Sequence, residues 1–177
     1  MLPVDVLVIE HKLIIRVVTL IRKEVEQIVK TNSVEPSKIT QFIAILRVYA
    51  DKYHHGKEEG ILFKELSQRH LSEADQKMMN DLVLEHALAR KTVTSLENAK
   101  ESYAAGKTEV IHDVLQLLNT LVELYPRHIE KEDKQFFYQS MKYFNKEEQD
   151  DLLKSCILFD QNFTNKYYTQ IVKTLEA

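Results

Sequence analysis

A short pattern of histidine and glutamate residues occurs twice in this chain, about 74 residues apart. In each copy a lone histidine is followed by a His-x-x-x-Glu motif, 43 residues later in the first copy and 42 residues later in the second. The residues of the pattern are His11, His54 and Glu58 in the first copy and His86, His128 and Glu132 in the second. Because the same residue types recur at nearly the same intervals, the pattern predicts that the two halves fold into similar structural units.

The sequence between these residues favours long helices. Only three glycines and three prolines occur in 177 residues, which leaves little of the turn chemistry that many short strands require. Apolar residues recur at intervals of three and four, as on the buried face of a helix. The segments that show this periodicity are 4–31, 36–69, 72–106, 108–144 and 145–177.

Five helices joined by short turns predict an all-α fold. We expect an antiparallel up-and-down four-helix bundle with an additional C-terminal helix. The bundle should cover residues 4–144 and the extra helix residues 146–175, within a single domain of residues 1–177.

Composition excludes several classes of function. The net charge is −3, with both signs mixed along the chain and no basic patch, so nucleic acid is not an expected partner. No run of about 18 apolar residues predicts a membrane span, and the N-terminus lacks the pattern of a secretory signal. The single cysteine, Cys156, excludes an intramolecular disulfide and is compatible with a reducing compartment. We therefore expect a cytoplasmic protein.

The spacing within each His-x-x-x-Glu motif has a chemical consequence. Residues four apart lie one turn apart on the same face of a helix, so each motif presents an imidazole and a carboxylate to one point. A carboxylate can bridge two metal ions while each imidazole holds one. In an antiparallel bundle, all four helices can aim these groups inward at one depth. This ligand set predicts a two-metal site and fits iron, with Zn or Mn as substitutes.

One further histidine, His55, breaks the symmetry of the two halves. It lies about 100° around the helix from His54, and Ile129 occupies the matching position in the second half. If His55 binds metal, the two metals have unequal ligand sets, and one keeps an open position for a small molecule such as O2. A supporting role or an exposed position would explain His55 equally well. The remaining histidines, His70 and His112, are expected at the surface.

The carboxylates beside these residues have two interpretations. Glu10 and Glu85 precede the lone histidines and could accept a hydrogen bond from an imidazole on another helix, although the sequence alone favours exposed polar neighbours. Glu59 and Asp133 follow the two glutamates of the pattern. They are expected to support the site or to be solvated, with Asp133 as the second choice for a metal ligand.

These residues resemble the hemerythrin-like family, also called the HHE cation-binding family. The resemblance covers about residues 4–144 and rests on the stretches 54–63 and 125–137 and on the Glu-His pairs at 10–11 and 85–86. It implies a four-helix bundle with a non-haem di-iron centre. The residues that carry over as ligands are His11, His54, Glu58, His86, His128 and Glu132. Family members bind O2 reversibly, sense O2 or redox state, handle nitric oxide or peroxide, or store and deliver iron.

The chain departs from the oxygen-carrying hemerythrins at one position. Those proteins have a second histidine in the third helix, four residues after the first, where this chain has Arg90. Iron-sensing members of the family use a ligand at the position of His55. The carriers also use His-x-x-x-x-Asp in the fourth helix, which Asp133 satisfies, but the internal repeat favours Glu132 because it aligns with Glu58.

The sequence favours a protein that binds or senses a small ligand such as O2 or NO at an open iron position, with no catalytic residue assigned. The alternatives are a di-iron enzyme that reduces peroxide or NO, and an iron storage or delivery protein. The C-terminal helix holds no expected ligand. Its apolar residues must be buried against this bundle or against a second subunit in a homodimer. They are Leu152, Leu153, Ile157, Leu158, Phe163, Tyr167, Ile171 and Leu175.

Overall fold

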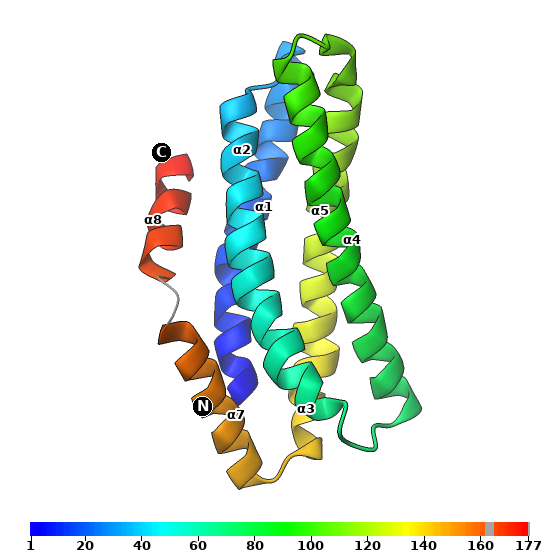
Figure 1. Cartoon of the computed structure of the whole chain (residues 1–177), viewed down its shortest axis with the longest axis vertical. Helices are drawn as coiled ribbons and strands as arrows, with labels where there is room; N and C mark the ends of the chain where they lie inside the picture. Colours follow the sequence, from blue (N-terminus) through cyan, green and yellow to red (C-terminus); the bar gives the residue numbers. More distant parts are fainter. Residues whose placement is uncertain (162–164, 177) are drawn as a thin grey trace.

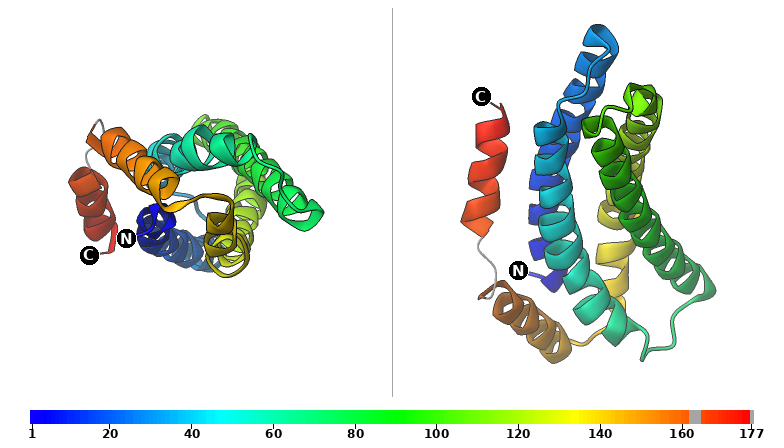
Figure 2. Two further views of the ribbon diagram at one scale, coloured as in Figure 1. Left: turned by 90° about the horizontal axis from the view of Figure 1, so that it is seen from below. Right: turned by 45° about the horizontal axis from the view of Figure 1, so that its top comes forward.

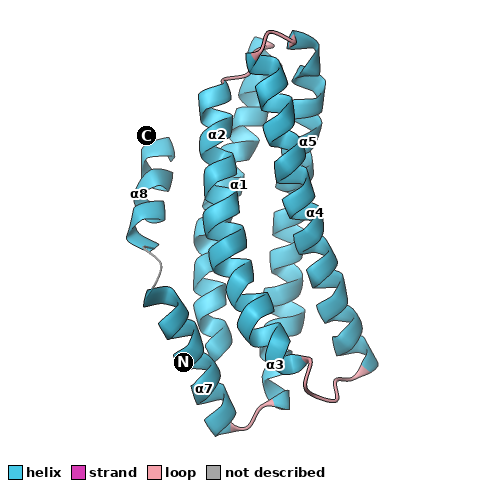
Figure 3. Ribbon diagram, viewed as in Figure 1, coloured by secondary structure: helices cyan, strands magenta, loops and turns pink. Residues whose placement is uncertain are grey.

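The computed structural model describes residues 1–161 and 165–176, and this part of the chain is helical without a strand (Figure 3). Four long helices run side by side in alternating directions and form a bundle (Figure 1). The predicted all-α bundle is therefore confirmed. The ends of the four bundle helices differ from the expected ones by at most three residues, since proline or a polar cap marks several of them.

The first bundle helix is α1 (Pro3–Thr31), which ends where Asn32 adopts the left-handed conformation. The second spans residues 36–66 and begins with Pro36 in its first turn. It comprises α2 (Pro36–Ile45), the π-helical segments η1 (Leu46–His55) and η2 (Glu58–Phe63), and α3 (Lys64–Leu66).

The third bundle helix is α4 (Glu73–Ala104), whose start is capped by the Ser72 side chain. The fourth spans residues 108–143. It comprises η3 (Thr108–Val110), α5 (Ile111–Lys131), the π-helical η4 (Glu132–Phe136), α6 (Phe137–Ser140) and η5 (Met141–Tyr143). The π-helical segments contain His54 and His55 in η1, Glu58 in η2 and Glu132 in η4, whereas His128 lies at the end of α5. Such π-helical turns often occur at functional sites.

Two apolar clusters fill the bundle, one on each side of the histidine and glutamate layer. In α1 the layer lies between Leu7 of one cluster and Leu13 of the other, and in α4 it lies between Leu82 and Ala89. Burial of this apolar surface provides the main stabilisation of the fold. It also offsets the cost of placing charged groups between the two clusters.

The C-terminal region differs from the single helix that the sequence predicts. It contains two helices, α7 (Lys146–Gln161) and α8 (Asn165–Glu176), which run in different directions beside α1 (Figures 1 and 2). Both contact α1, and Leu152, Cys156 and Val172 are buried. Phe163 and the side chain of Tyr167 lie outside the described residues.

None of the helices in the described ranges combines the length and the apolar character that crossing a bilayer requires.

Candidate metal centre

Each of the four bundle helices places either one histidine or one histidine–glutamate pair of the repeated pattern in a single buried layer. Helix α1 contributes His11, α4 contributes His86, and the second and fourth helices contribute the His-x-x-x-Glu pairs. His55 joins the layer from η1. All seven side chains belong to residues that are at most 3% exposed: His11, His54, His55, Glu58, His86, His128 and Glu132.

The seven residues form two overlapping groups of potential donor atoms. The two-imidazole group consists of His11, His54, Glu58 and Glu132, and the three-imidazole group consists of His55, Glu58, His86 and His128. Within each group one donor atom per residue lies within 4.8 Å of the others. Each group can therefore hold a metal ion.

Glu58 and Glu132 each direct one carboxylate oxygen toward the two-imidazole group and the other oxygen toward the three-imidazole group. For Glu58, Oε1 is 3.2 Å from Nε2 of His54 and Oε2 is 3.3 Å from Nε2 of His86. For Glu132, Oε2 is 3.3 Å from Nε2 of His11 and Oε1 is 3.2 Å from Nε2 of His128. This is the arrangement of carboxylates that bridge two positions.

The polar atoms at the centre of the layer are buried without hydrogen-bond partners among the described residues. They are both carboxylate oxygens of Glu58 and of Glu132, and Nε2 of His11 and of His54. Buried polar atoms without partners are rare and costly, so a cluster of them calls for a group that the chain does not supply. A pair of metal cations fits this requirement, because every orphaned atom is a metal donor.

The other ring nitrogen of each repeated histidine faces a carboxylate on a neighbouring helix. The pairs are His11 with Asp133 (2.8 Å), His54 with Glu10 (2.9 Å), His86 with Glu59 (2.6 Å) and His128 with Glu85 (2.9 Å), all measured from Nδ1. A proton on Nδ1 that is donated to the carboxylate leaves Nε2 free to bind metal.

This arrangement supports one expectation about the carboxylates and overturns another. Glu59 and Asp133 support imidazoles, as expected. The interpretation of Glu10 and Glu85 as exposed neighbours is wrong, since Glu10 is buried and Glu85 is largely covered. The occurrence of Glu-His in both halves is the sequence signal for their role, because adjacent helical residues point about 100° apart and so can serve two different helices.

His55 is held differently from the other four imidazoles. Its ring stacks on His86, with centroids 3.8 Å apart, while Nδ1 is 3.4 Å from Asp51 and has no hydrogen-bond partner among the described residues. Burial lowers the pKa of His55 to about 4. The ring is therefore neutral at physiological pH, which is the form that binds metal.

The electrostatics of the layer favour positive charge. Burial alone would lower the pKa of His54, but Glu58 and Glu10 outweigh it and raise the pKa to about 10. The same balance raises the pKa of His86 to about 11 and that of His128 to about 9. Burial would raise the pKa of Glu132, yet His128, His11 and His86 hold it well below its usual range. The bridging carboxylates are thus ionised and bind either protonated imidazoles or metal cations.

Arg90, at the position of the carriers' additional histidine, supports carboxylates of the site. Its Nε donates to Asp51 and its Nη2 donates to Glu59, both at 2.7 Å. Glu59 in turn accepts from His86. A cavity of about 210 Å³ is lined by Arg90, Asp51 and His55 among other residues.

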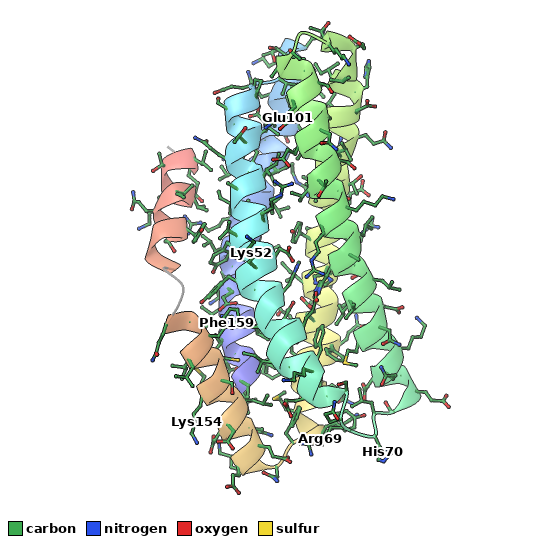
Figure 4. The ribbon with its side chains drawn as sticks, viewed as in Figure 1. Lys52, Arg69, His70, Glu101, Lys154 and Phe159 are labelled. Carbon is green, nitrogen blue, oxygen red and sulfur yellow. The ribbon has the colours of Figure 1, made fainter. Side chains whose placement is uncertain are left out.

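The two histidines expected at the surface are exposed. His70 follows the second bundle helix and points away from the bundle (Figure 4). His112 lies near the start of α5 and is also exposed. Neither belongs to the groups that can hold a metal ion within the described part of the chain.

Comparison with known families agrees with this geometry. The family model for the hemerythrin HHE cation binding domain matches residues 2–139, a range that contains all seven candidate ligands. Neither a curated protein nor a solved structure shows a significant match. From its four-helix bundle, its buried histidine and glutamate layer and this match over most of its length, the chain belongs to the hemerythrin HHE cation-binding domain family.

Proposed function

We propose that this protein is a non-haem di-iron protein that binds or senses a small ligand such as O2 or NO at an open iron position. The proposed metal ligands are His11, His54, Glu58, His86, His128, Glu132 and His55. The observation that carries the proposal is the inequality of the two groups, which share a bridging carboxylate but contain two and three imidazoles. Because Oε1 of Glu132 also faces His128, both glutamates can serve both positions. The position with two imidazoles then has four potential protein ligands against five at the other, and so retains room for a small molecule.

The surrounding residues suit a bound diatomic ligand. Iron would supply the reversible redox chemistry that O2 or NO binding requires. Glu58 and Glu132 would hold the two positions together. On the two-imidazole side the ring of Phe137 lies parallel to His11, 5.7 Å between centroids, within the apolar cluster that includes Leu7. This apolar cover excludes bulk water and favours a small, weakly polar ligand over a charged one.

Metal content tests the first part of the proposal. Elemental analysis should find about two iron ions per chain, and His54→Ala and His128→Ala should reduce this content. His112→Ala provides the control, because His112 is an exposed histidine on the same helix as His128. A wild-type protein that takes up no metal contradicts the proposal.

Optical spectroscopy tests the second part. The iron-loaded protein should show an absorption band that forms with O2 and disappears under vacuum. Irreversible oxidation without such a band contradicts reversible O2 binding, and sustained turnover of peroxide or NO with an electron donor would identify an enzyme. Rapid loss of all iron to a chelator would indicate storage or delivery.

We also propose a homodimer through the C-terminal region. On α7, Ile157 and Leu158 are exposed apolar residues that a second copy would cover. Sedimentation of the wild-type protein and of Leu158→Lys tests this contact. A wild-type monomer contradicts it.

A further inference from the structure

A fully buried lysine lies beside the two-imidazole group. Lys57 is 0% exposed, and its ammonium group contacts Glu10 and lies 2.7 Å from Oδ1 of Asp160. It also lies 3.8 Å from the centroid of the Tyr53 ring. A charge is retained in a protein interior only when it is paired, so the two carboxylates and the ring determine where Lys57 lies.

These contacts connect helix α7 with a proposed metal ligand. Asp160 belongs to α7 and contacts Lys57. Lys57 contacts Oε1 of Glu10, while Oε2 of the same carboxylate is 2.9 Å from Nδ1 of His54. Because both oxygens of Glu10 are engaged, the position of Lys57 determines how the carboxylate is presented to the imidazole.

The contact between α7 and the second bundle helix is closely packed near Lys57. A Cβ added to Gly56 would lie 3.3 Å from Cζ of Phe159, and the rings of Phe159 and Tyr53 have centroids 6.3 Å apart. Figure 4 marks Phe159 where α7 meets the bundle. Cys156 is buried and precedes Phe159 and Asp160 by three and four residues, so the three residues lie on one face of α7. Gly56 therefore leaves room for the Phe159 ring, which a Cβ at this position would displace by a few tenths of an ångström.

The second half of the molecule contains the same contacts without a covering helix. Lys131 contacts Glu85, which lies 2.9 Å from Nδ1 of His128. The side chain of Lys131 is 34% exposed, in contrast to the buried Lys57. Comparing the two lysines therefore shows the effect of α7 on the burial of the lysine that contacts the supporting glutamate.

We propose that Asp160 is a positioning residue of the metal centre, which acts through Lys57 and Glu10 on His54. Helix α7 lies outside the range matched by the family model, so this chain uses an added helix to complete one side of a family site. Docking of α7 and retention of metal on the two-imidazole side are then coupled, and coupling of this kind acts in both directions. The inference rests on the proposed metal binding.

Metal release from the full-length iron-loaded protein tests this role. Asp160→Asn should accelerate release of one of the two iron ions to a chelator by about 10-fold, the lower end of the range for partners of metal ligands. Asp160→Glu should restore part of the slow release. Asp150→Asn is the matched control, because Asp150 lies on the same helix and pairs with Lys146 one turn away, at the exposed surface. Lys57→Met should have a larger effect than Lys131→Met.

Amide hydrogen exchange of residues 146–161 provides the reciprocal measurement. Loading with iron should slow exchange in α7 of the wild-type protein, and Asp160→Asn should abolish this effect. The positioning role would be overturned if Asp160→Asn and Asp150→Asn released iron at the same rate. It would also be overturned if the amide exchange rate of α7 were the same with and without iron. Neither result would contradict metal binding itself. A wild-type protein without metal would overturn the proposed function as well, so the two failures are distinguishable.

Discussion

The two halves of this bundle build the same site geometry in different surroundings. The matching distances are 3.2 Å for both His54–Glu58 and His128–Glu132, and 2.9 Å for both His54–Glu10 and His128–Glu85. The surroundings differ, because α7 covers Lys57 in the first half whereas Lys131 in the second half is partly exposed. Repetition of sequence therefore reproduces the contacts within each half, and elements outside the repeat decide how strongly they are buried.

The halves also differ inside the site. His55 gives the first half an imidazole that the second half lacks, since Ile129 occupies the matching position and packs into the apolar core. The additional imidazole joins the group formed by His86 and His128 of the opposite half. A single unmatched residue thus makes the two candidate groups unequal in their number of imidazoles.

The largest effect should come from the residues that the halves share equally. Glu58→Gln and Glu132→Gln each remove one charge that faces both groups, so each should weaken both metal positions by about 100-fold or more. Metal titration measures the two affinities. Glu123→Gln, on an exposed glutamate of α5, is the control. Loss of only one metal in either variant would show that the carboxylate serves one position rather than both.

The unmatched histidine allows the asymmetry to be removed in two ways. His55→Ile should weaken one metal position by roughly 10- to 100-fold and leave the other, because it makes the first half resemble the second. Ile129→His should add an imidazole on the two-imidazole side and suppress binding of the small ligand. Elemental analysis and ligand titration measure both changes. Unchanged metal affinity in His55→Ile would contradict its proposed role as a ligand.

Metal-free and metal-loaded protein should respond to pH in opposite directions. The raised pKa values of His54, His86 and His128 mean that their protonated forms stabilise the metal-free fold fully below pH 6.5. This stabilisation is lost as the pH rises through about 9 to 11. Metal ions compete with the same protons, so metal affinity should increase over that range.

Thermal unfolding with and without metal, from pH 6.5 upward, measures these opposite trends. His55 adds little in this range, because burial keeps it neutral above a pKa of about 4. A metal-free protein that gains stability as the pH rises would contradict the raised pKa values.

The smallest effect should come from the arginine of the second half. Arg90→Met removes the partner of Glu59 and Asp51 but leaves every proposed ligand in place, so metal affinity should fall by less than about 10-fold. Arg47→Met is the matched control, because Arg47 pairs with Glu97 between the same two bundle helices and not with a carboxylate that faces an imidazole. If both variants behave alike, Arg90 acts on the fold and not on the site.

Local residue patterns predicted the all-α bundle, and the structure brings the predicted histidine and glutamate side chains close together in one layer. The helix that begins at Pro36 and the turn at Asn32 follow from backbone preferences of those residues. The division of the C-terminal segment into α7 and α8 does not follow, because apolar residues such as Leu158 and Ile171 continue the helical periodicity on both sides of the division. Periodicity records which residues can be buried, and it does not record where a helix changes direction.

By itself, the sequence determined which side chains share one buried layer, because helical spacing and the internal repeat place them at one depth on four helices. Only the tertiary structure decided that Glu10 supports His54 and that Lys57 is buried beneath Asp160. These contacts join residues 44 and 103 positions apart. They depend on how neighbouring helices rotate and on where α7 docks, and packing across the whole molecule sets both.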